Sequence, residues 1–245
     1  MNFIYHFGRY LLLIKNLFGK PEKFSIYWKE TLMQMNHIGV GSVVIVAIIS
    51  VFVGAVTTVQ TAYQLVSPLL PNSVIGTIVV ESTILELAPT ITCLVLAGKV
   101  GSNIASELAT MRVTEQIDAL EVMGVNAPMF LIGPKVVAAL FIIPVLIIIA
   151  AFLGITGGLV AGILSETLTQ EEFIRGARET FKPFSVLLLV VKSVTYAFII
   201  SSVSSYQGYY TRGGALEVGI ASTTSVVYSC ILILLSDYLI AELLL

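Results

Sequence analysis

Two long stretches of this 245-residue chain contain no charged residue, and they decide what it can fold into. The first runs from residue 38 to residue 80, and the second runs from residue 136 to residue 165. A helix needs about 20 apolar residues to cross the hydrocarbon core of a bilayer. Only 11% of all residues are charged, against about 25% in an ordinary soluble domain. The chain is therefore predicted to be an integral membrane protein.

The apolar sequence divides into five predicted spans. The stretch 38–80 is too long for one span and is interrupted by SPLLPNS at residues 67–73, so we expect a turn at Pro68 and Pro71. The predicted fold is all-α, with a five-span domain over residues 38–245. Its spans cover residues 38–66, 74–108, 136–165, 183–206 and 217–241.

Residues 1–37 mix aromatic and aliphatic side chains with lysine and arginine. Aromatic rings favour the headgroup level of a membrane, where basic side chains reach water or anionic lipid. The segment lacks the compact apolar core and small-residue cleavage site of a signal peptide. We predict one or two amphipathic helices that lie in the membrane interface.

The distribution of lysine and arginine predicts the orientation. With the amino terminus in the cytoplasm, the inner segments (1–37, 99–135 and 207–216) hold nine basic residues and the outer loops (67–73 and 166–182) hold three. Because basic residues accumulate in cytoplasmic loops, this orientation is favoured. It places residues 114–128 in the cytoplasm and a short polar helix of residues 166–182 outside.

Several function classes find no support in the sequence. The net charge is −2 and there is no basic tract, so nucleic-acid binding is not expected. HExxH and GxSxG motifs are absent from the sequence, and no His or Cys cluster has metal-ligand spacing. LAGKVGS at residues 96–102 lacks the pattern of a phosphate-binding loop. We expect no catalytic residue, no metal site and no cofactor bound by this chain, and we interpret Cys93 and Cys230 as buried, unpaired thiols.

Small residues recur at helical spacing in two predicted spans. They allow another helix to approach closely, within the chain or at a subunit interface. The positions are Ala97, Gly101, Ala105 and Ala109 in the second span and Gly154, Gly158 and Gly162 in the third.

Ionisable residues at membrane depth need a partner or a wet cavity. Glu81, Glu86, Lys99, Lys192 and Asp237 are such residues, and they suggest an internal polar path. Lys99 and Asp237 have the alternative of reaching the interface from a helix end. In the second span, Lys99 also shares a polar helix face with Asn103 and Glu107.

The polar stretch TEQIDALEVMGVNAP, residues 114–128, has the pattern of a short amphipathic helix. Val113, Ile117 and Leu120 would form its apolar face. Thr114 is predicted to cap its start, and Gly124 followed by Pro128 to end it. Its acidic edge would consist of Glu115, Asp118 and Glu121, which we interpret as a docking edge or a solvated face rather than a metal site.

Two long motifs resemble one known family. ELAPTITCLVLAGKVGSNIASELATMRVTEQIDALEVMGVNAPMFLIGPKVVA at residues 86–138 resembles the core of the MlaE/YrbE permeases of lipid-transporting ABC systems. GYYTRGGALEVGIASTTSVVYSCILILLSDYL at residues 208–239 is similar to their carboxyl-terminal motif. The likeness covers the chain from about residue 40 onward. Residue 88 is alanine where many family members carry glycine.

The resemblance implies a non-catalytic permease subunit in the bacterial inner membrane. It implies a homodimer, a separate ABC ATPase that binds ATP and Mg, and an MCE-domain lipid-binding protein, with a small STAS-type subunit as an optional component. The substrate would be a phospholipid or related lipid, moved between the inner membrane and the outer envelope. Residues 113–124 would be the coupling helix, with Thr114, Glu115, Asp118, Glu121 and Gly124 at the ATPase.

The two copies would enclose an apolar lipid cavity. Its candidate residues, or those of a polar path, are Val53, Val56, Gln60, Tyr63, Glu86, Lys99, Asn103, Glu107 and Asp237. Two alternatives remain at this point. One is an ion-coupled secondary carrier that uses Glu81, Glu86 and Asp237 as proton or cation sites, and the other is a scaffold subunit without transport.

Overall fold

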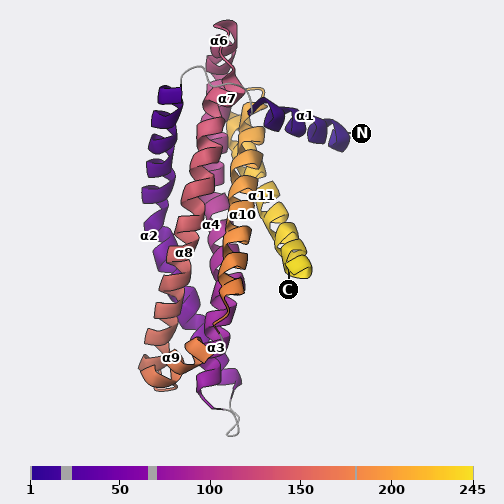
Figure 1. Ribbon diagram of the computed structural model, residues 1–245. Helices are drawn as coiled ribbons and strands as arrows, with labels where there is room; N and C mark the ends of the chain where they lie inside the picture. Colours follow the sequence, from indigo (N-terminus) through magenta and orange to yellow (C-terminus); the bar gives the residue numbers. More distant parts are fainter. Residues whose placement is uncertain (1, 18–23, 66–70, 180, 245) are drawn as a thin grey trace. The chain divides into compact units, whose positions relative to one another are not determined.

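The computed structural model describes residues 2–17, 24–65, 71–179 and 181–244, and these are almost entirely helical (Figure 1). No strand occurs among them. Residues 18–23 and Pro68, where part of the interfacial segment and the first predicted turn fall, lie outside the described residues. The principal helices are α1 (Asn2–Leu17), α2 (Phe24–Gln64), α3 (Ser73–Ser82), α5 (Ser102–Val113), α6 (Gln116–Val122), α7 (Ala127–Leu131), α8 (Gly133–Leu164), α9 (Gln170–Glu179), α10 (Pro183–Tyr209) and α11 (Ala215–Leu244).

Five helical segments of the described chain are long and apolar enough to cross a membrane, which confirms the predicted all-α fold with five spans. Their bounds differ most at the first and third spans. α2 is continuous from Phe24, so residues 24–37 belong to the same helix as the first span instead of forming a separate helix. The spans are Ser25–Gln64, Ser73–Val113, Ala127–Leu164, Pro183–Tyr209 and Ala215–Leu244.

The second span is helical throughout but changes its winding twice. Between α3 and α5 lie the π-helical stretch η1 (Thr83–Ile91), the short helix α4 (Thr92–Leu96) and the π-helical stretch η2 (Ala97–Gly101). Pro89 lies inside η1. Proline cannot donate a backbone hydrogen bond, so a local change of winding at this residue has a direct physical cause.

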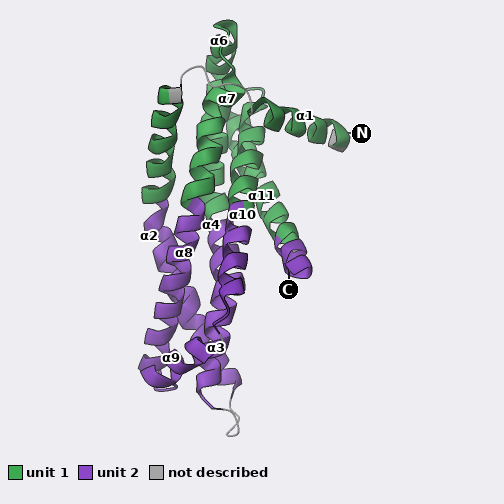
Figure 2. Ribbon diagram, in the orientation of Figure 1, with its two compact units in different colours: residues 1–41, 96–142, 195–236 green, residues 42–95, 143–194, 237–245 purple. Residues whose placement is uncertain are grey.

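The chain forms two compact units, coloured separately in Figure 2. Unit 1 comprises residues 1–41, 96–142 and 195–236, and unit 2 comprises residues 42–95, 143–194 and 237–245. In unit 1, α1 packs against α7, and α6 contacts α5 and α7. In unit 2, α9 packs against α3.

Helix α1 is held to α10 by polar and aromatic contacts. His6 Nδ1 lies 2.8 Å from the Tyr206 hydroxyl, and the Tyr10 hydroxyl lies 2.8 Å from Ser202 Oγ. Burial raises the pKa of Tyr10, against a smaller opposite effect of the Ser202 hydrogen bond. The other face of α1 exposes Ile4, Leu11 and Leu12 among other apolar side chains, a pattern that suits the predicted interfacial position.

Candidate functional site

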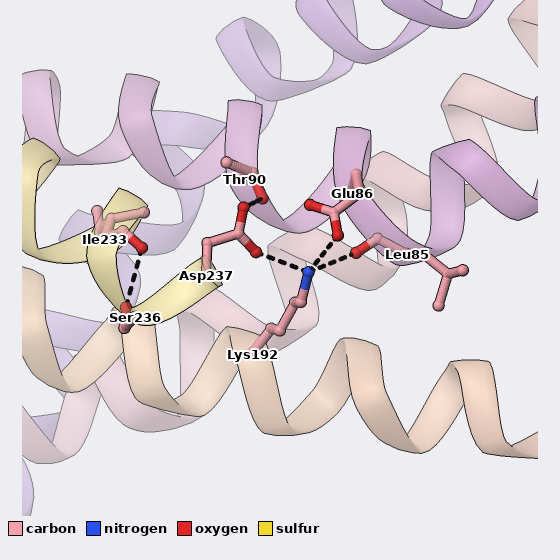
Figure 3. Close-up of polar contacts among 7 residues, drawn as sticks. All are labelled: Leu85, Glu86, Thr90, Lys192, Ile233, Ser236 and Asp237. Carbon is pink, nitrogen blue, oxygen red and sulfur yellow. Dashed lines mark hydrogen bonds and ion pairs between the residues drawn. The ribbon is translucent and has the colours of Figure 1, made fainter. Parts of the chain in front are cut away.

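Lys192 of α10 is the centre of a charged cluster in unit 2. Its side chain is fully buried, and its Nζ lies 2.7 Å from Glu86 Oε1 and 2.6 Å from Asp237 Oδ1 (Figure 3). It also donates to the backbone oxygen of Leu85 at 3.0 Å. An ammonium has three N–H donors, so these three acceptors satisfy it. Removal of any one partner would leave a buried polar group unpaired at a large energetic cost.

The Leu85 carbonyl lies in the π-helical stretch η1, four residues before Pro89. The Lys192 ammonium donates to its oxygen as well as to the two carboxylates. Thr90, next along η1, donates to the second oxygen of Asp237 at 3.1 Å.

Sequence reasoning named Glu86, Asp237 and Lys192 separately, as groups that each need a partner. The structure brings all three together, on η1, α11 and α10. Two carboxylates face one ammonium, and the Glu86 side chain keeps 45% of its surface exposed. Glu86 is therefore the member of the cluster that remains most accessible from outside.

The predicted polar face of the second span is a separate feature that belongs to unit 1. Lys99 donates to the backbone oxygen of Gly41, and Asn103 is exposed. Glu107 forms a 2.6 Å ion pair with Lys135 of α8, whose side chain is only 3% exposed. Sequence reasoning missed Lys135 because it was counted as a loop residue. A lysine two residues into a long apolar helix is the signal that could have identified it.

The four candidates of the first span do not line one cavity in the described chain. Val53 borders a water-sized void together with Ser50, Thr83 and Gly154. The other three candidates lie on one exposed face of α2; they are Val56, Gln60 and Tyr63. Val56 is 61% exposed and Tyr63 is 83% exposed.

The predicted acidic helix exists as α6 but is shorter than residues 113–124. Thr114 does not cap its start, which corrects the prediction. It ends α5, and its hydroxyl bonds back to the Thr110 carbonyl. Glu115 follows with a left-handed backbone (φ 60°) and precedes α6. The chain therefore bends between two helices instead of starting one at a capping threonine.

The carboxyl end of α6 has the geometry that the sequence predicts. Gly124 has a φ of 82°, its N–H donates to the Glu121 oxygen, and the Val125 N–H donates to the Leu120 oxygen. These two bonds form a Schellman motif, in which glycine supplies the positive φ.

Two of the three residues of the predicted acidic edge already have partners in unit 1. Asp118 forms a 2.6 Å ion pair with Arg112 of α5. Glu121 accepts a 2.7 Å hydrogen bond from the Tyr209 hydroxyl of α10. The Glu115 carboxylate has no hydrogen bond or ion pair within the described part of the chain. The acidic edge thus fastens α6 to its own unit and leaves one carboxylate unengaged.

The apolar side chains at the tip of α6 are the exposed ones. Ile117 is fully buried, whereas Val122 is 88% exposed and Met123 is 68% exposed. Neither was singled out from the sequence, because helical periodicity sorted the apolar residues onto one buried face. The last turn of α6 instead leaves Val122 and Met123 exposed.

The small-residue stripe of the second span packs inside unit 1. Ala97 and Ala105 have no exposed surface. A Cβ added to Gly101 would lie 2.8 Å from Ser204 Oγ, and one added to Gly208 would lie 2.5 Å from the Ala105 oxygen. α5 and α10 therefore meet at backbone distance.

The stripe of the third span packs inside unit 2 against α2 and its neighbours. A Cβ on Gly158 would lie 2.6 Å from Thr58 Oγ1, and one on Gly162 would lie 3.3 Å from Thr58 Cγ2. Gly154 meets a glycine that sequence reasoning did not name. A Cβ on Gly54 would lie 1.8 Å from the Gly154 oxygen.

Comparison with known proteins identifies the family to which the chain belongs. The family model described as Permease MlaE matches residues 31–243. The chain belongs to the MlaE permease family. It is an ABC transporter permease and a multi-pass membrane protein, as the sequence motifs had indicated.

Relatives of this MlaE permease come from bacteria and plants. It is 39% identical to a probable ABC transporter permease protein of Rickettsia bellii, over 89% of this chain and 84% of the relative. It is 35% identical to one of Synechocystis, over 87% and 81% of the two chains. It is also 32% identical to the chloroplastic protein TRIGALACTOSYLDIACYLGLYCEROL 1 of Arabidopsis thaliana, over 90% of this chain and 63% of the relative.

Proposed function

We propose that this permease moves phospholipid or a related lipid between the inner membrane and the outer envelope of a bacterium. The observation that carries the proposal is the match to Permease MlaE over nearly the whole chain. The name of the Arabidopsis relative is that of a glycolipid, which supports a lipid substrate. In this proposal the amino terminus is cytoplasmic, in accord with the basic residues of the inner loops.

The transported lipid would lie between two copies of the chain. Val56, Gln60 and Tyr63 support this arrangement because they form an exposed, mainly apolar face on a spanning helix. A single polar amide on such a face can orient a headgroup without hindering the passage of acyl chains. Glu86 adds the partly exposed carboxylate of the Lys192 cluster as a second candidate polar contact.

The energy for transport would come from a separate ABC ATPase, which binds ATP and Mg. This chain would be non-catalytic and would receive the conformational change through α6. The fastening of α6 to α5 and α10 supports the role, because a helix that is tied to two spans transmits a displacement to both. An MCE-domain protein, and in some systems a STAS-type subunit, would complete the assembly.

The ion-coupled carrier is the weaker alternative. Its proposed sites Glu86 and Asp237 both bind the Lys192 ammonium, which already supplies a positive charge at that position. Membership of an ABC permease family argues in the same direction. A carrier would transport its substrate without any ATPase.

The test is reconstitution of the chain in lipid vesicles with and without the ABC ATPase of its own source, followed by transfer of a fluorescent phospholipid. We expect transfer only with both proteins and ATP. Transfer by the permease alone under an ion gradient would support the carrier. ATP hydrolysis by an assembled complex without lipid movement would support the scaffold.

A further inference from the structure

An apolar groove with a volume of about 420 Å³ lies between α8 and α9 in unit 2. One wall is the last part of α8, with Ile155 and Leu159. The other is α9, with Ile174 and Arg178, and Phe181 lies just beyond that helix. Pockets of 300–1,000 Å³ are of the size that proteins use to bind small ligands.

The groove lies beside the carboxyl-terminal part of a spanning helix. α8 is a spanning helix that ends at Leu164, and α10 is a spanning helix that begins at Pro183. α9 connects them and is too short and too polar to cross the membrane, so it must lie at the membrane surface. A groove between α9 and the end of α8 therefore opens where lipid phosphates meet their acyl chains.

Arg178 gives the groove a positive charge at its edge. Its side chain is exposed, and it forms no ion pair within the described ranges of the chain. A guanidinium matches the geometry of a phosphate through two parallel hydrogen bonds. The remaining lining is almost entirely apolar and suits an acyl chain.

We propose that this groove is a phospholipid site at the membrane surface, with the phosphate on Arg178 and an acyl chain against Ile155 and Leu159. The apolar wall and the cation at its edge match the two parts of one phospholipid. A protein partner would need to bring both an apolar ridge and an anion to this place, whereas the membrane supplies both. The proposal rests on the position of α9 in the membrane and does not require lipid transport.

The experiment uses the full chain in nanodiscs that contain phosphatidylglycerol with a photoreactive group in its acyl chain. Labelled peptides are then mapped by mass spectrometry. We expect labels at residues 155–159 and 173–178. Arg178→Gln should lower labelling there about tenfold, the equivalent of one charge-assisted hydrogen bond. Arg175→Gln is the matched control, because Arg175 is an exposed arginine of the same helix that does not line the groove.

A second variant tests the space itself. Ala177→Trp places a large side chain into the groove and should abolish labelling there while labels elsewhere on the chain persist. Its folding is checked by the unfolding temperature, and Ile174→Trp replaces it if that temperature falls. Equal labelling of wild type and Arg178→Gln would overturn the proposal in favour of nonspecific lipid contact. Absence of label with cross-links between copies at Ile174 would overturn it in favour of a second copy. Loss of transport with labelling intact would count only against the proposed function.

Discussion

Helices α6 and α9 both join two spans, but they are fastened through opposite kinds of side chain. α6 is held by its charges, through pairs with Arg112 and the Tyr209 hydroxyl. Its last turn leaves Val122 and Met123 in the open. The apolar end of α6 is therefore the part that is free to contact another protein.

α9 is held by its apolar face and its backbone. Phe173 is 2% exposed, and Gly176 lies so close to α3 that an added Cβ would come within 2.0 Å of the Ser73 oxygen. Its arginines, Arg175 and Arg178, remain exposed. Because packing holds α9, its arginines remain available to water or lipid headgroups. Because polar contacts hold α6, its exposed apolar residues remain available to a partner.

The largest expected effect comes from a methyl group at Gly176. Gly176→Ala forces a backbone clash with α3 and should lower the free energy of unfolding by about 2 kcal/mol or more, as overpacking does. Gly124→Ala, just after α6, is the matched change, because it meets open space and only the φ of 82° is strained. It should cost about 1 kcal/mol. Denaturant unfolding in micelles measures both, and equal losses would show that α9 is not anchored by its backbone.

The exposed tip of α6 should matter for association and not for folding. The double change Val122→Ser and Met123→Ser should leave the unfolding free energy within about 0.5 kcal/mol of wild type. If α6 docks on the ATPase as proposed, it should weaken binding about tenfold, or 1.4 kcal/mol, in a titration with the purified ATPase.

Two controls sharpen this prediction. Leu164, at the end of α8, has a similarly exposed apolar side chain (78% exposed). Leu164→Ser should leave ATPase binding unchanged. Glu115→Gln removes the one unengaged carboxylate of the acidic edge. Weakening by Glu115→Gln alone would restore the acidic edge as the docking surface and contradict a role for Val122 and Met123.

The bond between Tyr209 and Glu121 should have a smaller, local effect. Tyr209→Phe removes the hydroxyl that donates to Glu121 and should cost about 1 kcal/mol. Hydrogen exchange should show faster exchange at residues 116–122. Tyr210→Phe is the control, because it keeps the ring that lies 3.9 Å from the Arg9 guanidinium. Equal exchange in both variants would show that the bond does not hold α6.

Periodicity and composition predicted the five spans, the small-residue stripes and the end of α6 at Gly124, because each follows from local spacing. Partners far apart along the chain could not be predicted. The sequence showed that Lys192 needed an acceptor, but it did not show that Glu86, Asp237 and the Leu85 carbonyl meet around it. It also showed an acidic edge on α6 without Tyr209, which lies 88 positions away from Glu121.

The predicted start of α6 at Thr114 was wrong for a different reason. Thr114 is a good capping residue by type, but α5 continues to Val113 and uses Thr114 at its own end. A capping signal within a long helical stretch therefore does not say which of two helices it serves. The same limit applies to α2, where no local signal separates residues 24–37 from the first span.

The smallest expected effect concerns the start of α9, which is fastened by a capping box. The Thr169 backbone N–H and hydroxyl donate to Glu172 Oε2 at 2.9 Å and 2.8 Å, and the Glu172 N–H donates to Thr169 Oγ1. The backbone bond, and then the hydroxyl bond, hold the pKa of Glu172 below its usual value of 4.5. The folded state therefore binds fewer protons than the unfolded state between the two pKa values. Its stabilisation is complete above the unfolded pKa and is lost as the pH falls through the lower, folded pKa.

The measurement is the difference in unfolding temperature between wild type and Glu172→Gln as a function of pH. Wild type should be the more stable at about pH 6, where the carboxylate is ionised in both states. The difference should shrink as the pH falls below about 4 and the carboxylate takes up a proton. Glu171→Gln is the control, since Glu171 is exposed and takes no part in the capping box. A difference that stays constant across this range would show that charge at Glu172 does not stabilise α9. The contrast with α6 would then become sharper, because α9 would depend on packing and hydrogen bonds without a contribution from charge.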